Sequence, residues 1–339
     1  MLSNTHLDQL FSATNIDVTR LEFIQKSQNY VYRYSDGDDQ KIIRICKGRY
    51  RTVSQVEAEL IWVNHLADCG IKTCRPIELQ DGTFLKSVEI NGEDNILTLF
   101  KHAPGSQVDR SKADEAVFER IGRLTGEMHT AAHHFSQANE SIERPLWKDS
   151  RLLNHDVETH KNLIKSSTLK SLNQLIKSIS NTSQSDENFG IIHADINSVN
   201  LHQNNNDLWI YDFDNCEYGY FTQDLATILW DSIYCKVLNK FADNGMNARI
   251  QPFWEALLKG YSSASPMKML DLTLLKKLFL LREATIYIHY HRTLNLAEIS
   301  ESLGQGLEVM RNNIEAQDHQ VDFKFISEQQ TYMTLSHEH

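Results

Sequence analysis

The sequence predicts an α+β fold, in which a small antiparallel sheet is followed by a mostly helical remainder. Strand-like runs, rich in apolar and aromatic residues, occur at residues 21–25, 30–34, 41–45, 84–90 and 96–102. Helix-like runs, with apolar residues three or four apart, occur at residues 53–68, 111–135, 156–180, 225–234 and 251–315. We therefore expect two lobes: residues 1–102, which hold the sheet, and residues 103–339, which are mainly helical.

Composition and charge narrow the functional classes. The 339 residues are 41% hydrophobic and 23% charged, which is typical of a globular protein. The 45 acidic residues outnumber the 34 basic ones, giving a net charge of −11, so nucleic acid is not expected as the main partner. No apolar run approaches the roughly 18 residues of a membrane span, and no signal-peptide pattern is seen. The five cysteines form no C-x-x-C pair, so we expect no zinc site, no disulfides and a cytoplasmic location.

Two more elements are expected in the first lobe. A short helix over about residues 5–12 precedes the first strand, and residues 71–77 have the composition of an additional strand. The helix at residues 53–68 carries an apolar stripe that would face the core, and it ends at Cys69-Gly70.

The residues expected to carry out chemistry are concentrated between residues 193 and 214. Asp195 follows His193 by two positions, Asn200 follows Asp195 by five, and Asp212 ends a later apolar run. This order matches the phosphoryl-transfer pattern of kinases, H-R-D-x-x-x-x-N followed by D-F-G. Asp195 would accept or orient the proton of an acceptor hydroxyl group. Asn200 and Asp212 would offer a neutral and an anionic oxygen to Mg²⁺.

The local context favours this interpretation over a chance cluster of polar residues. Residues 189–192 form a short apolar run that would enter the loop as a strand. Residues 204–207 are turn-forming, and residues 208–211 would form the strand that delivers Asp212. Loop, hairpin and metal-binding Asp therefore occur in the order that the chemistry requires.

These motifs resemble those of the aminoglycoside phosphotransferase and choline kinase family, including a bacterial group with HADLHxxN and FDFDDCxYGWFxxDIA. The resemblance spans roughly residues 20–300 and lies in His193-Ala194-Asp195, Asn200, Asp212-Phe213-Asp214 and Gln223-Asp224-Leu225-Ala226. It implies a protein-kinase-like two-lobed fold, a first lobe that binds ATP, a second lobe that binds the acceptor and carries out catalysis, and a requirement for Mg²⁺. Asn197 departs from the pattern, because relatives usually have His there, and its contact to phosphate or acceptor is left open.

Arg44 is the expected phosphate-binding cation. It follows two apolar residues on the strand at residues 41–45, in the position of the Lys in V-A-I-K. A guanidinium group can bind phosphate oxygens bidentately. The alternative is an outward-facing strand cation, and Lys41 should point to the other face of the sheet. By the resemblance, Glu59 pairs with Arg44; the alternative is Glu57, two residues away.

Two further segments are expected to contact the nucleotide. Ser27 and Asn29 lie where kinases place a Gly-rich loop over the phosphates, although this segment has no glycine and fits an ordinary hairpin turn equally well. Phe100, Lys101 and His102 occupy the hinge position, where backbone groups would bond the edge of adenine.

Several residues around the catalytic loop have supporting or alternative roles. His193 is expected to be catalytic together with Asp195. Asp214 would bind a second Mg²⁺ or hold the loop, with the metal favoured. Asp224 is expected to cap the N-terminus of the following helix, and the resemblance implies that it braces the catalytic loop. His129 is expected to pack and hydrogen-bond below that loop.

The predicted function is Mg-ATP-dependent phosphorylation of a hydroxyl group on a small molecule such as an amino sugar, an amino alcohol or a hydroxy-amino acid. The alternatives are a bacterial Ser/Thr protein kinase of the same fold and a nucleotide-binding pseudokinase with a regulatory role. The acidic character of the chain favours an amine-bearing acceptor. Arg282 is the counter-argument, because it could hold a carboxylate from a polar stripe with Glu283, Tyr287 and His291; a solvated helix face is the alternative for that stripe. The acceptor's identity, ATP or GTP preference and oligomeric state are not predicted.

Overall fold

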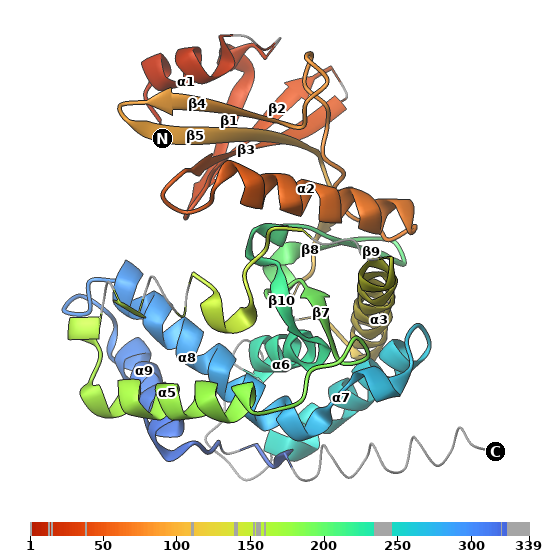
Figure 1. Cartoon of the computed structure of the whole chain (residues 1–339), viewed down its shortest axis with the longest axis vertical. Helices are drawn as coiled ribbons and strands as arrows, with labels where there is room; N and C mark the ends of the chain where they lie inside the picture. The colour runs from red at the N-terminus through yellow and green to blue at the C-terminus, as the bar shows by residue number, and fades with distance from the viewer. Residues whose placement is uncertain are drawn as a thin grey trace. The chain divides into compact units, whose positions relative to one another are not determined.

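The structure is a computed structural model, shown in Figure 1. It describes residues 2–12, 14, 16–37, 39–109, 112–138, 142–151, 153, 157–158, 161–233, 246–319 and 321–323. The chain divides into two compact units. The first comprises residues 1–107, 141–144 and 200–214, and the second comprises residues 108–140, 145–199 and 215–339. The expected lobe boundary between residues 102 and 103 stays a prediction.

A five-stranded antiparallel sheet forms the body of the first unit. Its strands lie in the order β1 (Leu21–Lys26), β2 (Tyr30–Asp36), β3 (Asp39–Lys47), β5 (Glu93–Lys101) and β4 (Leu85–Ile90). Every neighbouring pair is antiparallel, so the predicted antiparallel sheet is confirmed.

The expected strand at residues 71–77 is wrong. This segment makes only isolated bridges, one from Thr73 to Ile210 and one from Pro76 to Phe100. The Thr73 hydroxyl donates to the Ile210 carbonyl oxygen at 2.8 Å. Proline has no backbone N–H to donate to a strand ladder, so the segment is an extended connection rather than a strand.

Two helices cover the two faces of this sheet, as Figure 1 shows. Helix α1 (Asn4–Phe11) packs its apolar residues against Ile43 and Leu97 on one face. Helix α2 (Val53–Asp68) packs Val56 and Leu60 against the opposite face. Its first residue follows a capping box made by Thr52 and Gln55, which satisfies two donors at the helix start.

A small three-stranded sheet completes the first unit. Its strands are β6 (Ser106–Gln107), β8 (Leu201–Asn204) and β9 (Asp207–Ile210), in that order. Gly105 approaches the β8 backbone so closely that a Cβ atom there would overlap Gln203. Leu201 pairs with Ile210. Asn200 and Tyr211, which lie just outside this pair, are therefore at the same end of the hairpin.

Helices dominate the second unit. They are α3 (Glu115–Gln137), α5 (Ser166–Ser180), α6 (Phe221–Ser232), α7 (Met246–Ser262), α8 (Leu275–Thr293) and α9 (Glu301–Ala316). One two-stranded sheet is made by β7 (Phe189–Ile192) and β10 (Glu217–Tyr220). Short 3₁₀ turns occur in both units; they span Val18–Arg20, Trp147–Asp149, Lys161–Leu163, Ser198–Asn200, Phe213–Asn215, Met267–Met269 and Leu272–Leu274.

Helices α3 and α7 pack closely along each other. Gly122 lies against the backbone of Leu257, and Gly260 lies against the backbone of Glu119; a Cβ atom at either glycine would overlap a carbonyl oxygen. Two turns beyond Gly122 on α3 lies His129, and one turn beyond Leu257 on α7 lies Tyr261. The close approach of the helices brings these two side chains within hydrogen-bond distance.

Some sequence expectations differ from the structure in their bounds. In the run predicted over residues 156–180, helix α5 begins only at residue 166, after a short 3₁₀ turn. Residues 154–156 and 159–160 lie outside the described residues, as do Cys235 and most of the chain after residue 318. No helix in the described ranges is long and apolar enough to cross a membrane.

Candidate active site

The backbone of the catalytic loop is anchored by Asp224. Its carboxylate accepts hydrogen bonds from the N–H groups of His193 at 3.1 Å and Ala194 at 2.8 Å. The predicted bracing role is therefore confirmed, but the predicted N-cap is wrong. Helix α6 begins at Phe221 after Tyr220, so Asp224 lies inside its first turn, with its carboxylate bonded to the loop. Ala194 has φ 63°, a left-handed conformation that such anchoring can maintain.

A buried chain of polar side chains supports Asp224. His129 Nε2 lies 3.2 Å from Asp224 Oδ2, and His129 Nδ1 lies 3.0 Å from the Tyr261 hydroxyl. Phe221 stacks on the His129 ring, with centroids 4.6 Å apart. Burial raises the pKa of Tyr261, so its hydroxyl keeps its proton. The expected packing and hydrogen-bonding role of His129 is confirmed.

The His193 side chain supports the loop from within. It is buried, and its Nδ1 accepts the backbone N–H of Asp195 at 3.2 Å. The ring therefore helps to set the conformation of the residue that follows Ala194. A direct chemical role for His193 stays a prediction.

The Asp195 carboxylate receives two side-chain donors on one oxygen. Arg282 Nη2, from α8, lies 2.5 Å from Asp195 Oδ1, and Asn197 Nδ2 lies 3.0 Å from the same atom. Asn197 also bonds the Asp195 carbonyl oxygen at 3.2 Å and accepts the N–H of Val199 at 3.0 Å. The residue that departs from the family pattern thus orders the loop itself.

The far end of the loop is tied to the same helix. The Ser198 N–H and hydroxyl groups lie 3.3 and 3.2 Å from Asp231 Oδ2. Asp231 and Asp224 are seven residues apart on α6, which places them on one face of that helix. Helix α6 therefore holds both ends of the catalytic loop.

The polar stripe predicted on α8 divides into two parts. Arg282 reaches Asp195, whereas Glu283, Tyr287 and His291 are buried. The His291 ring packs on Tyr287, with centroids 4.1 Å apart, and α9 donates to Glu283 through Asn313 at 3.1 Å. The solvated-face alternative is therefore wrong for these residues.

In the first unit, Arg44 and Glu59 form a buried bidentate ion pair. Arg44 Nη1 and Nη2 each lie 2.7 Å from a different oxygen of Glu59. The two residues are 5% and 1% exposed, so the outward-facing alternative for Arg44 is wrong, and Glu57 is exposed. Lys41 pairs with Asp39 at 3.4 Å.

The charge of Arg44 is stabilised despite its burial. Burial alone would lower its pKa, but the charge and hydrogen bonds of Glu59, followed by the charges of Asp214 and Asp212, raise it. The guanidinium carbon also lies 5.1 Å from the centroid of the Phe100 ring. Arg44 is therefore a fixed cation in the neighbourhood of the Asp212-Phe213-Asp214 segment.

The two predicted metal ligands lie at the same end of the β8–β9 hairpin. The Tyr211 N–H donates to the Asn200 carbonyl oxygen at 3.2 Å. This bond holds the backbone next to Asp212 close to the backbone of Asn200. Asp212 is exposed and has φ 65°, an uncommon left-handed conformation. Within the described ranges no group of three or more His, Cys, Asp or Glu residues could hold a metal ion. An amide oxygen and a carboxylate nevertheless suit Mg²⁺, which commonly takes one or two protein carboxylates with water and phosphate.

Asp214 lies in an arginine-rich environment. Its carbonyl oxygen accepts from Arg51 Nε at 3.1 Å, from Arg51 Nη2 at 2.8 Å and from Arg144 Nη2 at 2.5 Å. Its carboxylate lies 3.3 Å from Arg51 Nε. These contacts favour the loop-holding alternative for Asp214. Sequence reasoning missed both arginines, because partners 163 and 70 residues away leave no local pattern.

The predicted phosphate-covering turn is an ordinary β1–β2 turn with one unusual residue. The Ser27 N–H donates to the Asn29 carbonyl oxygen at 3.1 Å, and the Ser27 side chain is exposed. Asn29 is 6% exposed, and its Oδ1 is buried with no hydrogen-bond partner among the residues that the structure describes. Contacts of either residue to a nucleotide stay predictions.

The predicted hinge has its backbone donors engaged. The Lys101 N–H donates to Arg75 O at 2.9 Å, and the His102 N–H points to Gln40 O at 3.4 Å. An adenine edge would therefore have to use other groups or displace these bonds. The base-binding role of Phe100, Lys101 and His102 stays a prediction.

A cluster of rings lies next to the hinge and was not predicted. The His102 and His202 ring centroids are 6.0 Å apart, and His202 and Tyr211 are 5.1 Å apart, both edge to face. Burial, followed by the charges of His202 and Arg33, lowers the pKa of His102. Burial raises the pKa of Tyr211 to about 12.

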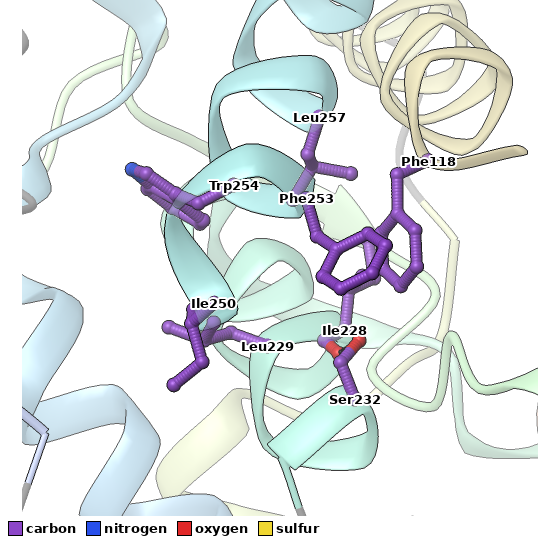
Figure 2. Close-up of a pocket in the computed structure, with 8 residues that line it drawn as sticks. All are labelled: Phe118, Ile228, Leu229, Ser232, Ile250, Phe253, Trp254 and Leu257. Atoms are coloured by element: carbon purple, nitrogen blue, oxygen red, sulfur yellow. Dashed lines mark hydrogen bonds between the residues drawn. The ribbon is translucent and has the colours of Figure 1, made fainter. Parts of the chain in front are cut away.

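A pocket among α3, α6 and α7 is lined by none of the predicted site residues (Figure 2). Its lining is Phe118, Ile228, Leu229, Ser232, Ile250, Phe253, Trp254 and Leu257. The Ser232 hydroxyl already donates to the Ile228 carbonyl oxygen at 2.6 Å. Because a polyhydroxylated ligand needs several polar partners, this apolar hollow is not a candidate acceptor site.

Comparisons with known proteins agree with this geometry. A model of the phosphotransferase enzyme family matches residues 20–258. Amicoumacin kinase of Bacillus subtilis (strain 168) is 26% identical over 297 residues, which is 87% of this chain and 87% of the relative.

Two solved structures are similar over nearly the whole chain. An amicoumacin kinase in complex with AMP-PNP, Ca²⁺ and Ami has a TM-score of 0.82 and 22% identity, and the match covers 95% of each chain. A microcompartment-associated aminopropanol kinase has a TM-score of 0.66 and 18% identity, with 93% of this chain and 96% of the other covered. The predicted kinase-like α+β fold is confirmed.

Proposed function

Because the chain belongs to the phosphotransferase enzyme family, and is therefore an enzyme that phosphorylates a hydroxyl group of a small molecule, we propose that Mg²⁺-bound ATP is its donor and an amine-bearing alcohol its acceptor. One observation carries the proposal: Asp195 is held by two donors on a loop whose two ends are bonded to α6. A proton acceptor in a fixed orientation is what transfer to a hydroxyl group requires.

Arg44 is the nucleotide-binding cation of this proposal. Its guanidinium group is fixed by Glu59 on a strand of the central sheet, so little side-chain freedom is lost when a phosphate binds. The nearby carboxylates of Asp212 and Asp214 keep it charged. A related kinase was solved with AMP-PNP and Ca²⁺, which supports a nucleotide and a divalent ion for this chain as well.

Asn200 and Asp212 would hold the divalent ion, and Mg²⁺ fits their oxygen donors. When bound, the ion would neutralise negative charge on the phosphate oxygens. The backbone contacts of Arg51 and Arg144 to Asp214 keep the segment that carries Asp212 in place. Asp214 itself is assigned to this supporting role.

Asp195 orients the acceptor hydroxyl group and takes its proton. As the hydroxyl oxygen forms its bond to the γ-phosphorus, the bond from that phosphorus to ADP breaks and the proton passes to the Asp195 carboxylate. The products are ADP and a phosphate monoester. The rate comes from positioning and charge neutralisation, without a covalent enzyme intermediate.

The acceptor class rests mainly on relatives. One is named for aminopropanol, whose amine is cationic at neutral pH, and the chain carries a net charge of −11. The local negative charge is smaller than a count of carboxylates suggests, because Asp195 pairs with Arg282 and Asp214 lies beside Arg51. An amine on the acceptor is still favoured by the surplus of acidic residues.

Matched acceptors test this class. We expect amine-bearing alcohols to have a higher kcat/KM than their N-acetyl forms, which keep the hydroxyl groups but lose the charge. The advantage should shrink as ionic strength rises, because salt screens long-range attraction. ADP release measured with 1-amino-2-propanol, 1,2-propanediol and lactate provides a second series on one carbon skeleton. Preference for lactate, or for the acetylated forms, would contradict the amine assignment.

Arg44 and Lys41 form a matched pair on one strand. Arg44→Met should raise the KM for ATP about tenfold or more, the effect of losing roughly 1.4 kcal/mol of binding, whereas Lys41→Ala should leave it within twofold. The KM is measured by coupled ADP release at saturating acceptor, with thermal unfolding as the check on folding. If Lys41→Ala has the larger effect, the phosphate-binding face of β3 is misassigned.

A further inference from the structure

Arg282 contacts the catalytic carboxylate directly, although it lies 87 residues further along the chain. Its Nη2 is 2.5 Å from Asp195 Oδ1, and the two side chains are 12% and 21% exposed. The guanidinium carbon also lies 5.9 Å from the centroid of the Trp230 ring, so an aromatic side chain of α6 packs near it.

The position of Arg282 is set by a buried helix. Its neighbours Leu281 and Glu283 are 3% and 0% exposed, so α8 presents this side chain from a rigid element. Asn197 donates to the same Asp195 oxygen from within the loop. The last side-chain torsion of an aspartate is otherwise broad. Two donors on one oxygen, one from the loop and one from α8, restrict that torsion.

The Arg282–Asp195 pair is largely shielded from solvent. Removing one partner of such a pair leaves the other charge without compensation. Loss of Arg282 would therefore leave the Asp195 carboxylate without its charged partner in a mostly buried position.

We propose that Arg282 is a positioning residue that acts through Asp195, keeping the carboxylate oriented for proton transfer. The inference rests on the proposed function and revises one expectation from the sequence. Arg282 would not be an anchor for an acceptor carboxylate, so its loss should lower turnover with every acceptor, whether amine-bearing, neutral or acidic.

A double-mutant cycle tests this proposal. Arg282→Met should lower kcat about 10- to 100-fold and leave the KM for ATP within twofold, since a displaced catalytic group can cost about 10²-fold. Arg282→Lys should recover part of the loss, because Lys keeps the charge but not the planar fork. In an Asp195→Asn background, Arg282→Met should change kcat by less than twofold, because residues that act as a unit are not additive. An equal loss in both backgrounds would show that Arg282 acts independently of Asp195 and would overturn the proposal.

The matched control is Arg311→Met. Arg311 is 14% exposed and pairs with Glu308 and Glu315 on its own helix α9, so it resembles Arg282 in burial and pairing. Its loss should leave kcat within twofold. A loss in Arg311→Met as large as in Arg282→Met would indicate a general effect of removing a buried arginine, and would also overturn the proposal.

A measurement without turnover separates this inference from the proposed function. In protein labelled with ¹³C at aspartate carboxyl groups, the Asp195 signal is assigned by its loss in Asp195→Asn. The chemical shift of that signal should change in Arg282→Met, because the carboxylate loses one of its two side-chain donors, and should stay the same in Arg311→Met. This result can be obtained even if wild-type protein phosphorylates none of the acceptors, which would count against the proposed function alone. An unchanged signal in Arg282→Met would contradict the role assigned to Arg282.

Discussion

Asp195→Asn should lower kcat by at least about 10²-fold, while ATP binding stays nearly unchanged. Asparagine keeps the shape of the side chain but cannot take a proton, and removal of a positioned proton acceptor typically costs about 10²- to 10⁴-fold. The N–H bonds from His193 and Ala194 to Asp224 do not involve the Asp195 side chain, so the loop should keep its backbone conformation. Turnover is measured as ADP release at saturating ATP and acceptor, and ATP affinity by calorimetry.

Asp186→Asn is the control for this variant. Asp186 precedes the catalytic strand in the same unit and is exposed. The same substitution there should leave kcat unchanged. If Asp195→Asn turns over like wild type, the catalytic assignment is wrong, whatever the acceptor proves to be.

Asp212→Ala should abolish the metal-dependent part of ATP binding. The carboxylate supplies the anionic ligand of the proposed Mg²⁺ site, and the residue's left-handed backbone conformation is uncommon outside glycine. In wild type we expect Mg²⁺ to tighten ATP binding by about tenfold or more, or roughly 1.4 kcal/mol. In the variant the affinities with Mg²⁺ and with EDTA should be equal. Asn200→Ala should reduce the difference less, because a neutral oxygen contributes less to the site's charge.

The control for Asp212→Ala lies in the same hairpin. Asp207 is exposed in β9 and pairs with Lys72 at 2.5 Å, so Asp207→Ala removes a carboxylate nearby without touching the proposed ligands. It should keep the full Mg²⁺ effect. Equal ATP affinity with and without Mg²⁺ in wild type would remove the metal role from both Asp212 and Asn200.

The fold and the core of the candidate site could be predicted because both leave local patterns. Runs rich in apolar and aromatic residues predicted each strand of the main sheet, and the spacing of His193, Asp195, Asn200 and Asp212 predicted a phosphoryl-transfer loop and hairpin. The Arg44–Glu59 pair could be predicted because both residues hold fixed places in known motifs. The segment at residues 71–77 failed because composition alone cannot show whether a partner strand is available.

Contacts between distant segments could not be predicted. Asp224 has the sequence position of an N-cap, but its carboxylate bonds the loop N–H groups, and only the packing of α6 on β7 shows this. Arg282 was one of the four residues of the predicted polar stripe on α8, and nothing in its neighbourhood in the sequence separates it from Glu283, which is fully buried. Hydrogen bonds between residues 31 or 87 positions apart can be identified only once the helices are placed in the fold.

The most direct test of the account is the product itself. Protein, ATP, Mg²⁺ and each member of the matched acceptor panel are incubated together and followed by ³¹P NMR. We predict a new phosphate-monoester signal with at least one amine-bearing alcohol, in step with ADP formation, and no such signal with Asp195→Asn or in EDTA. Failure to form a phosphate ester with any acceptor, despite ATP binding, would contradict the account and favour a nucleotide-binding regulatory protein. Transfer to a protein Ser or Thr in place of every small alcohol would contradict it as well.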